Sequence, residues 1–481
     1  MEEKKEKKKK EKQIPNFAES LILVLISLAI LTYNIFVIRG DAHVPLIIAA
    51  CILSLYAIYK LGFTWDELTE GITRGINDLA TTFMIFGIIG MMIASWTQAG
   101  VIPTLICYGL KILNPKFFLV LAMVICAIVS TATGSSWTTV GTMGVVFLGI
   151  GTGFGIPAAA TAGACISGAY FGDKISPLSD TTNLAPTVAG ATLFGHVRHM
   201  LVSSGISLAI AGVIFFFMGL NYDVAGADSS MVLEISDSIS QNFYTSPILL
   251  IVPVVVIVCG ILKKPAVPSL VLGVFLGDLC AIIFQHQSLS SILDALQYGY
   301  VFESDSEMLS ELLSGGGIQD MMWTLSLTLC AVIFGSILDT TKMLKVISDK
   351  VLLLAKSTGS LIVCTVLTCL GMNIITGDQY LSIILPGKMY REEYAKRGLA
   401  PENLSRALED SATVTSPLVP WSSCAAVMVG ALGIPTVTYL PYCFFSMASP
   451  LVSIFLGFTG ITITKIAVDA AADKIKSKKS A

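Results

Sequence analysis

Two acidic side chains in the first half of the sequence have almost no other acids near them. Asp173 and Asp180 are the only Asp or Glu residues between Asp78 and Asp223, and the polar stretch 173–183 that holds them has apolar segments on both sides. Hard cations such as sodium prefer carboxylate, hydroxyl, amide and carbonyl oxygens as ligands, and this stretch contains all of them. A carboxylate can bind sodium when it is ionised and a proton when it is neutral. The stretch therefore predicts a cation and proton site.

The second half offers three further acids, Asp378, Glu409 and Asp410, with no acid from Ser411 to Val468. We expect ion binding or coupling from all three. A helix cap is the alternative for Asp378, and a solvated pair is the alternative for the other two. The candidate sodium or substrate ligands near these acids are Ser135, Ser136, Ser176, Thr181, Thr182, Asn183, Thr376, Gln379, Thr413, Thr415, Ser416, Trp421 and Ser422. Each hydroxyl can instead bond to a carbonyl of its own helix, and a tryptophan can anchor at the lipid interface.

The surroundings of these residues are a lipid bilayer. The chain has 481 residues with 30 Lys and Arg and 33 Asp and Glu, about half of the roughly 120 charges expected for a soluble chain of this length. Its apolar residues form runs near the length of a membrane span. We therefore expect an all-α polytopic membrane protein with about 10 to 13 crossings. The clear spans are Ser20–Val37, Val44–Leu61, Leu79–Ile93, Phe117–Ala132, Met200–Leu220, Pro247–Leu262, Pro268–Phe284, Met322–Leu338, Ser360–Ile375 and one near Val437–Phe458.

The polar stretch is too polar to face lipid, and unwound backbone survives at membrane depth only inside protein or against a water-filled cavity. Ser176 can cap a helix whose first residue is Pro177, and Ser416 and Pro417 can do the same. The sequence thus predicts two broken helices near the midplane. In a membrane, acids at such positions are functional by default. The structural alternatives are that Asp173 pairs with Lys174 or caps a helix, and that Asp180 caps the helix it precedes.

Several short motifs recur in the same order and indicate an internal repeat. The recurring pairs are Thr133-Gly134 with Thr376-Gly377, Ser176-Pro177-Leu178 with Ser416-Pro417-Leu418, and Gly190-Ala191 with Gly430-Ala431. Transporters are often built from such repeats, commonly inverted ones. The expected organisation is a basic tail at 1–19, N-terminal helices at 20–78, a first transport repeat at 79–220, a linker with two spans at 221–321, a second transport repeat at 322–460 and a basic tail at 461–481.

The distribution of charge predicts the orientation. Lysines dominate both ends, Lys263 and Lys264 lie in one connection, and 388–406 is rich in Lys and Arg. Such segments tend to stay in the cytoplasm, so we expect both termini there. The stretch 390–408 alternates charged residues with Leu and Ala, which suggests a helix at the membrane interface.

The motifs resemble those of the NhaC family of sodium/proton antiporters, in the ion-transporter superfamily. The resemblance rests on the sequence from Gly172 to Ala185, on Thr376-Gly377-Asp378-Gln379-Tyr380, on Glu409-Asp410 and on the sequence from Thr415 to Trp421. It covers roughly 80–460 and implies an inverted repeat with paired hairpins and an elevator or rocking movement. Many relatives have an amide residue after the tryptophan, where this chain has Ser422.

The resemblance and the residues together predict an antiporter of the bacterial inner membrane that exchanges sodium for protons by alternating access. The alternative is a sodium- and proton-coupled exchanger of organic acids of the malate and lactate type. We expect no enzymatic activity, no cofactor and no nucleic-acid partner. Sodium, protons and the bilayer are the expected partners. A small carboxylate substrate and a homodimer remain open.

Overall fold

The computed structural model describes residues 12–222, 229–262, 264–304, 310 and 312–466. Within them the chain is helical, without strands apart from two isolated bridges. Eight helices are long and apolar enough to cross a membrane, or up to eleven spans if three bent helix pairs are included. Eight of the ten expected spans are these single helices, and the other two fall in bent pairs, Ile235–Asn242 with Pro247–Ile261 and Thr436–Tyr442 with Phe444–Thr459. The protein is a multi-pass membrane protein.

The helices before the first repeat and in the linker are α1 (Phe17–Tyr33), α2 (His43–Tyr56), α3 (Trp65–Asp78), α12 (Ser229–Asn242), α13 (Ile251–Ile261), α14 (Ala266–Gln285) and α15 (Leu289–Tyr298). The first repeat contains α4 (Ala80–Gln98), α5 (Val101–Ile112), α6 (Phe118–Thr133), α7 (Ser136–Thr139), α8 (Val145–Gly153), α9 (Ala158–Ile175), α10 (Asp180–Ala189) and α11 (Leu193–Asn221). The second contains α17 (Met322–Thr340), α18 (Met343–Leu352), α19 (Thr358–Thr376), α20 (Gln379–Lys396), α21 (Pro401–Leu408), α22 (Ser423–Leu432), α23 (Thr436–Tyr439) and α24 (Phe444–Thr459).

Short 3-10 and π turns connect or interrupt these helices. The π turns are η1 (Asn34–Ile38), η2 (Ala57–Leu61), η4 (Val140–Gly144) and η6 (Glu409–Thr413). The 3-10 turns are η3 (Pro115–Phe117), η5 (Pro247–Leu250), η7 (Ser416–Leu418) and η8 (Leu440–Tyr442). A π turn inside an α-helix frequently marks a functional site, and η6 carries Glu409 and Asp410.

The structure confirms the internal repeat and fixes its register. The helices α4 and α17 are each 19 residues long and start 242 residues apart. From the ends of α6 and α19 onward the displacement is 243: α6 ends before Gly134 and α19 before Gly377, each with a positive φ, of 70° and 65°. The ten-residue helices α10 and α22 end before Gly190 and Gly433, again with positive φ. Equivalent helices therefore stop and restart at equivalent places.

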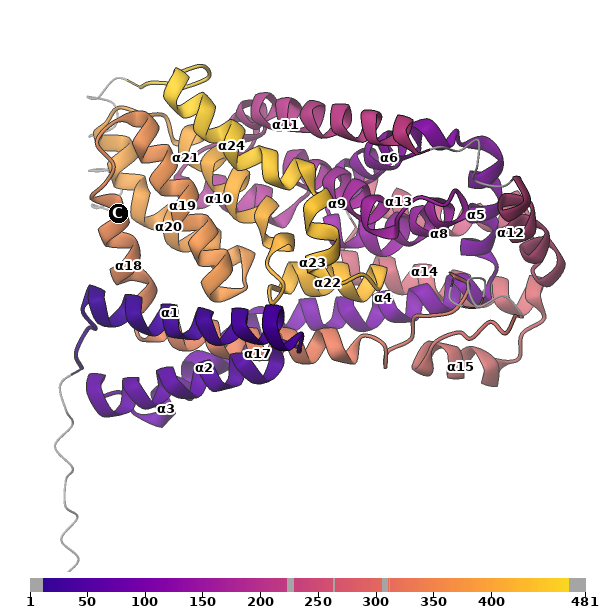
Figure 1. The fold of residues 1–481 in the computed structure, drawn as a ribbon, viewed down its shortest axis with the longest axis horizontal. Coiled ribbons are helices and arrows are strands. Elements are labelled where there is room, and N and C mark those ends of the chain that lie inside the picture. The colour runs from indigo at the N-terminus through magenta and orange to yellow at the C-terminus, as the bar shows by residue number, and fades with distance from the viewer. Residues whose placement is uncertain (1–11, 223–228, 263, 305–309, 311, 467–481) are drawn as a thin grey trace, which may run out of the picture.

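The two copies run in opposite directions (Figure 1). The helix α4 starts at the end of the molecule that carries α3 and leads to α5 at the far end, whereas α17 starts on the side of α15 and leads back to α18. The repeat is therefore inverted, as the resemblance implied. The N-terminal helices α1, α2 and α3 pack against the second copy, on α17 and α18.

Part of the sequence alignment between the copies was wrong. In the structural register Ser176 and Pro177 match Val419 and Pro420, and Gly190 matches Gly433, whereas Gly430 lies inside α22. The Ser-Pro-Leu and Gly-Ala matches are thus three residues out of step. The expected caps are wrong for the same reason. Ser176 ends α9, while Ser179 caps α10. Ser416 and Pro417 start only the short turn η7, and Ser422 caps α22.

Candidate functional site

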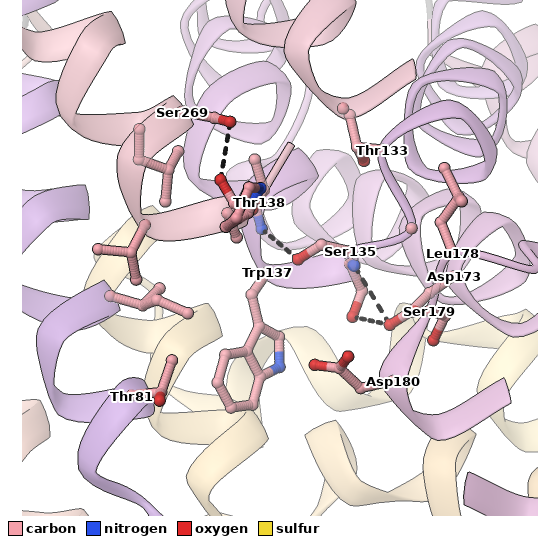
Figure 2. Close-up of a pocket in the computed structure, with 18 of the residues that line it drawn as sticks. Thr81, Thr133, Ser135, Trp137, Thr138, Asp173, Leu178, Ser179, Asp180 and Ser269 are labelled. Carbon is pink, nitrogen blue, oxygen red and sulfur yellow. Dashed lines mark hydrogen bonds between the residues drawn. The ribbon is translucent and has the colours of Figure 1, made fainter. Parts of the chain in front are cut away.

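A cavity of about 690 Å³, the first cavity, lies at the breaks of the first repeat. It is lined by the tips of α6 and α7, the end of α9, the start of α10, and parts of α4, α13, α14 and α20 (Figure 2). Its charged lining residues are Asp78, Asp173, Asp180 and Lys264. Three carboxylates thus face one ammonium group, and the lining favours a cation.

Asp173 is held by the start of α7. Its Oδ2 accepts hydrogen bonds from Ser136 Oγ (2.6 Å) and from Ser136 N (3.2 Å). Ser135 caps the same helix, with its Oγ accepting from Thr138 N (3.2 Å). A helix N-terminus carries partial positive charge and stabilises an anion. Asp173 is 8% exposed, so protein atoms surround most of its side chain. The geometry agrees with the cap alternative for Asp173 and contradicts the alternative that it pairs with Lys174.

Asp180 faces the same cavity in a different way. It is the first residue of α10, it is exposed, and its carboxylate points into the cavity (Figure 2). The cap of α10 is Ser179, which accepts from Thr182 N. Asp180 is therefore free of the capping role that was its structural alternative. One carboxylate held by protein and one open to the cavity together give this lining the negative charge that attracts a cation.

Polar side chains on either side of Asp180 stabilise the break. Thr182 Oγ1 donates to the carbonyls of Asp173 and Lys174, both at 3.0 Å. Asn183 Nδ2 donates to Pro177 O (3.0 Å) and Ser179 O (2.7 Å). Ser176 Oγ donates to Thr131 O (2.8 Å). These groups satisfy bare carbonyls rather than face the first cavity.

The tip of the second repeat lies at another cavity of about 640 Å³, the second cavity. Asp378 caps α20, with Oδ1 accepting from Leu381 N (2.8 Å), and it lines this cavity together with Thr376. Its equivalent in the first repeat is Ser135. Asp78 and Tyr380 line both cavities, so the two cavities meet at these residues. Asp378 both caps α20 and lines the second cavity, so the helix-cap alternative is compatible with the expected role in ion binding.

The break between η6 and α22 is packed differently. Thr415 Oγ1 donates to Ser411 O (2.5 Å), Ser422 Oγ to Ser416 O (2.5 Å), and Trp421 Nε1 to Ile374 O (2.7 Å). The hydroxyls of Thr413 and Ser416 are buried without a partner among the described residues. The Glu409 carboxyl group is a polar neighbour of Thr413, and the Cys424 thiol is a polar neighbour of Ser416, which occupies the position equivalent to Asp173.

A buried cluster of charges lies beyond the cavities. Lys174 Nζ donates to Asp410 and to Ser449 Oγ (2.9 Å), and Asp410 Oδ1 accepts from Ser203 Oγ (3.0 Å). Arg406 Nε lies 3.8 Å from Asp410 Oδ2. All three charged side chains are fully buried. The pair therefore joins α9 of the first repeat to η6 of the second.

Glu409 is also fully buried, and neither of its carboxyl oxygens has a hydrogen-bond partner among the described residues. Thr181, Thr413, Lys174 and Asp173 are its polar neighbours. The alternative of a solvated Glu409 and Asp410 pair is wrong, because both side chains are fully buried. The suggested interfacial helix is wrong as well, because α20 ends at Lys396 and α21 buries Asn403 to Leu408.

The structure thus divides the predicted residues into three groups. Ser135, Ser136, Asp173, Asp180, Thr181 and Gln379 line the first cavity, and Thr376 and Asp378 line the second. The remaining candidates line neither cavity: Ser176, Thr182, Asn183, Glu409, Asp410, Thr413, Thr415, Ser416, Trp421 and Ser422. Their roles as ligands stay predictions.

Sequence reasoning gave no site role to Asp78, Tyr380 or Arg406, and it named Lys174 only as an alternative partner of Asp173. Asp78 and Tyr380 line both cavities, and Lys174 and Arg406 neutralise Asp410. The signal for Lys174 was available, because a lysine inside an apolar helix requires a buried partner. In the part of the chain that the structure describes, no group of three or more His, Cys, Asp or Glu side chains could hold a metal ion. A sodium site here would use hydroxyl and carbonyl oxygens beside its carboxylates.

Comparison with known proteins identifies the family. Residues 168–461 match the model of the Na+/H+ antiporter family. The chain belongs to this family. It is 36% identical to the Na(+)/H(+) antiporter NhaC of Alkalihalophilus pseudofirmus, over 93% of this chain and 96% of that protein. The resemblance to NhaC proteins stated from the motifs is confirmed.

Other relatives in this family are named for different substrates. The chain is 37% identical to the arginine/ornithine antiporter ArcD of Halobacterium salinarum, over 93% of this chain and 92% of that one. It is 35% identical to the malate-2H(+)/Na(+)-lactate antiporter of Bacillus subtilis, over 94% and 96%. All three relatives are antiporters.

Proposed function

We propose that this protein exchanges sodium for protons across the membrane, with the proton gradient driving sodium out of the cell. The observation that carries the proposal is the pair Asp173 and Asp180, which face one cavity. An open carboxylate binds sodium or a proton, and never both, so one site is enough to couple opposed fluxes. Membership of the Na+/H+ antiporter family supports the same conclusion.

The roles of the two acids differ. Asp180 is open to the cavity, and we assign it the exchange of sodium for a proton. Asp173 is held in place by Ser136 and the start of α7, and it adds negative charge at a fixed position. Because this negative charge is already in position before a cation binds, little reorganisation of the protein is needed on binding. Hydroxyl oxygens of Ser135 and Thr181, which line the same cavity, would complete a sodium site.

The inverted repeat supports alternating access. In carriers of this kind, one copy moves against the other around a site near the midplane. The two breaks of this chain lie at equivalent positions of oppositely directed copies, and the Lys174–Asp410 pair connects them. Movement of α9 relative to η6 has to carry this pair along, because separating two buried charges is costly.

The basic connections support a cytoplasmic location for both termini. The connections that follow α17, α18 and α20 carry Lys342, Lys356 and Arg397, and they lie at the end of the molecule that holds α3 and α18 (Figure 1). Lysine and arginine favour the cytoplasmic side. Lys264 lines the first cavity and lies in the connection between α13 and α14, while its neighbour Lys263 lies outside the described residues. Both cavities would then open inward, in a bacterial inner membrane.

Exchange of organic acids is the second candidate. Trp137 lines the first cavity, and its indole N–H has no partner among the described residues, so it can donate to a carboxylate substrate. The name of the malate-2H(+)/Na(+)-lactate relative agrees with this candidate. Three carboxylates against one lysine in the lining oppose it, because like charges repel. The absence of enzymatic activity and of a cofactor stays a prediction, and a homodimer stays open.

Proteoliposomes with an internal pH dye distinguish the two candidates. Sodium added outside is expected by itself to enter the proteoliposomes in exchange for internal protons, so the internal pH rises. A signal that requires malate or lactate together with sodium would support the organic-acid exchanger instead. A signal with arginine or ornithine but not with sodium would contradict both candidates.

A further inference from the structure

The carboxyl group of Glu409 is buried without a partner. Its side chain is fully buried, and neither oxygen has a hydrogen-bond partner among the described residues. The two buried bases nearby are engaged with another acid. Lys174 Nζ donates to Asp410 and to Ser449 Oγ, and Arg406 Nε lies 3.8 Å from Asp410 Oδ2. Because an unsatisfied buried polar group requires an explanation such as a bound ion, and an unpaired buried charge is costly, this carboxylate calls for a cation.

Two threonine hydroxyls adjoin the Glu409 carboxyl group. Thr413 and Thr181 are its polar neighbours. The hydroxyl of Thr413 is itself buried without a hydrogen-bond partner in the described part of the chain. Glu409 and Thr413 are the first and last residues of the π turn η6, so a single turn of backbone holds both. Carboxylate and hydroxyl oxygens are ligands that hard cations such as sodium prefer.

The backbone plan of the repeat does not require these polar side chains. The equivalent of η6 in the first copy lies inside α9, which is α-helical throughout. At the displacement of 243 residues, Glu409 corresponds to Ile166 and Thr413 to Tyr170. The π turn and its two oxygen-bearing side chains are therefore specific to the second copy, and π turns inside α-helices frequently mark functional sites.

Glu409 lies behind the wall of the first cavity. Asp173 and Thr181 line that cavity, and both are also neighbours of Glu409, which does not line it. Thr181 directly follows Asp180, the carboxylate that is open to the cavity. A cation at Asp180 is thus separated from the Glu409 carboxyl group by the side chains that the two places share.

The buried charges around Glu409 leave room for one positive charge. Three acids, Asp173, Glu409 and Asp410, are buried here together with two bases, Lys174 and Arg406. With all five ionised the sum is one negative charge. One monovalent cation balances it, and the attraction is strong because the effective dielectric constant is lower in a protein interior than in water.

We propose that Glu409, Thr413 and Thr181 form an inner site for the transported sodium ion, behind the outer site at Asp173 and Asp180. This proposal rests on the proposed exchange of sodium for protons. Thr181 belongs to the first copy of the repeat, and Glu409 and Thr413 belong to the second, so a sodium ion at the inner site is held between the two copies. In carriers with such repeats, alternating access moves one copy against the other around the bound substrate.

Stabilisation of the folded protein by sodium tests the inner site. The unfolding temperature is measured in detergent over a series of NaCl concentrations, with choline chloride keeping the ionic strength constant, because a ligand that binds only the folded state raises its stability. The background is Asp180→Asn, which removes the open carboxylate of the outer site and is expected to keep a response to sodium. A background variant without any sodium response would overturn the proposal.

Adding Glu409→Gln to this background keeps the size of the side chain and removes its charge. The sodium concentration that produces a given rise in unfolding temperature is expected to increase about tenfold or more, since a lost interaction with a charged group weakens binding by at least that factor. A structural role of Glu409, or a carboxyl group that keeps a proton, would leave the sodium response unchanged. Either result overturns the proposal.

A second threonine provides a matched control. Thr104 on α5 is also buried with a hydroxyl that lacks a partner among the described residues, and it lines neither cavity. Thr413→Val is expected to raise the sodium requirement about threefold or more, the effect of one lost ligand oxygen, whereas Thr104→Val is expected to leave it unchanged. Equal effects of the two substitutions would contradict an inner site at Thr413.

Transport separates a failure of the inner site from a failure of the proposed function. In proteoliposomes the full chain is expected to exchange sodium for protons, and Glu409→Gln alone is expected to raise the sodium concentration for half-maximal exchange. If the full chain exchanges and Glu409→Gln has an unchanged sodium requirement, the inner site is overturned and the proposed function stands. A full chain that shows the Glu409-dependent response to sodium without any exchange would support the inner site and overturn the proposed function alone.

Discussion

The two copies of the repeat share a backbone plan and differ in the chemistry at its key positions. Ser135 and Asp378 occupy equivalent caps, and each accepts a hydrogen bond from the third residue of its helix. Asp173 and Asp180 of the first copy correspond to Ser416 and Ser423 of the second. Asp173 and Asp180 thus sit on the broken α9–α10 segment of the first copy, and Asp378 sits at the helix tip of the second. The broken segment of the second copy carries Glu409 and Asp410, which line neither cavity.

This difference shows how an inverted repeat separates scaffold from site. Glycines with positive φ, serine caps and ten-residue helices recur because the backbone needs them in both copies. Charged side chains do not recur, since two symmetric sets of buried acids would repel each other across the midplane. Instead, Lys174 of the first copy pairs with Asp410 of the second.

The largest expected effect belongs to the exposed acid of the first cavity. Asp180→Asn removes the charge that exchanges sodium for a proton, and we expect exchange in proteoliposomes to fall about a hundredfold or more, comparable with the loss of a key acid or base. Asp349→Asn is the matched control, because Asp349 is exposed on α18 and lines neither cavity. Normal exchange by the Asp180 variant would remove this residue from the site.

The second effect concerns the link between the copies. Lys174→Gln leaves Asp410 buried beside Arg406 alone, and we expect about 3–5 kcal/mol of destabilisation, the range for breaking a buried pair. Thermal unfolding in detergent measures it, with Lys350→Gln on the exposed face of α18 as the control. The double variant Lys174→Gln with Asp410→Asn is expected to recover part of the stability. No recovery would mean that the two charges act independently.

A third substitution makes the second tip resemble the first. Asp378→Ser keeps an oxygen that caps α20, so we expect a change in stability of at most about 0.5 kcal/mol. The sodium concentration for half-maximal exchange is expected to rise severalfold, because the carboxylate of the second cavity is lost. An unchanged sodium requirement would show that Asp378 acts only as a cap.

Competition for a shared carboxylate also sets the pH dependence. Protons bind the same carboxylates as sodium, so lowering the pH on the sodium side is expected to raise the sodium concentration for half-maximal exchange. The maximal rate at saturating sodium should change much less. A sodium requirement that is independent of pH would indicate separate sites for the two ions.

The smallest expected effect is the difference in stability between alanine substitutions at the two glycine turns. Alanine at Gly134 or Gly377 is strained by the positive φ, at about 1–2 kcal/mol. An added Cβ at Gly134 would also lie 2.6 Å from Leu178 Cβ and 2.7 Å from Leu178 C, whereas at Gly377 the nearest atom is Trp421 O at 2.9 Å. We therefore expect Gly134→Ala to lower the unfolding temperature more than Gly377→Ala. The reverse order would show that the second break is packed more rigidly.

Much of the fold was predictable because lipid imposes simple rules on sequence. Long apolar runs predicted the spans, and the Thr-Gly pairs predicted the breaks at Gly134 and Gly377, which the structure confirms. The Ser-Pro-Leu match failed because an identical tripeptide does not by itself fix the register between the two copies. The proline equivalent to Pro177 is Pro420, and Pro417 lies in the 3-10 turn η7. The glycine caps Gly190 and Gly433 give the correct alignment.

The sequence by itself determined the solvent, the repeat and the scarce acids, since each of these follows from local composition and spacing. Only the tertiary structure decided which polar groups meet. It brought Lys174 to Asp410, which are 236 positions apart in the sequence. It turned Asp180 toward the first cavity and buried Glu409. It also placed Lys12 beside Glu67 at the second cavity. The physical reason is that a charge buried in a membrane protein needs a partner, and packing of distant helices selects that partner.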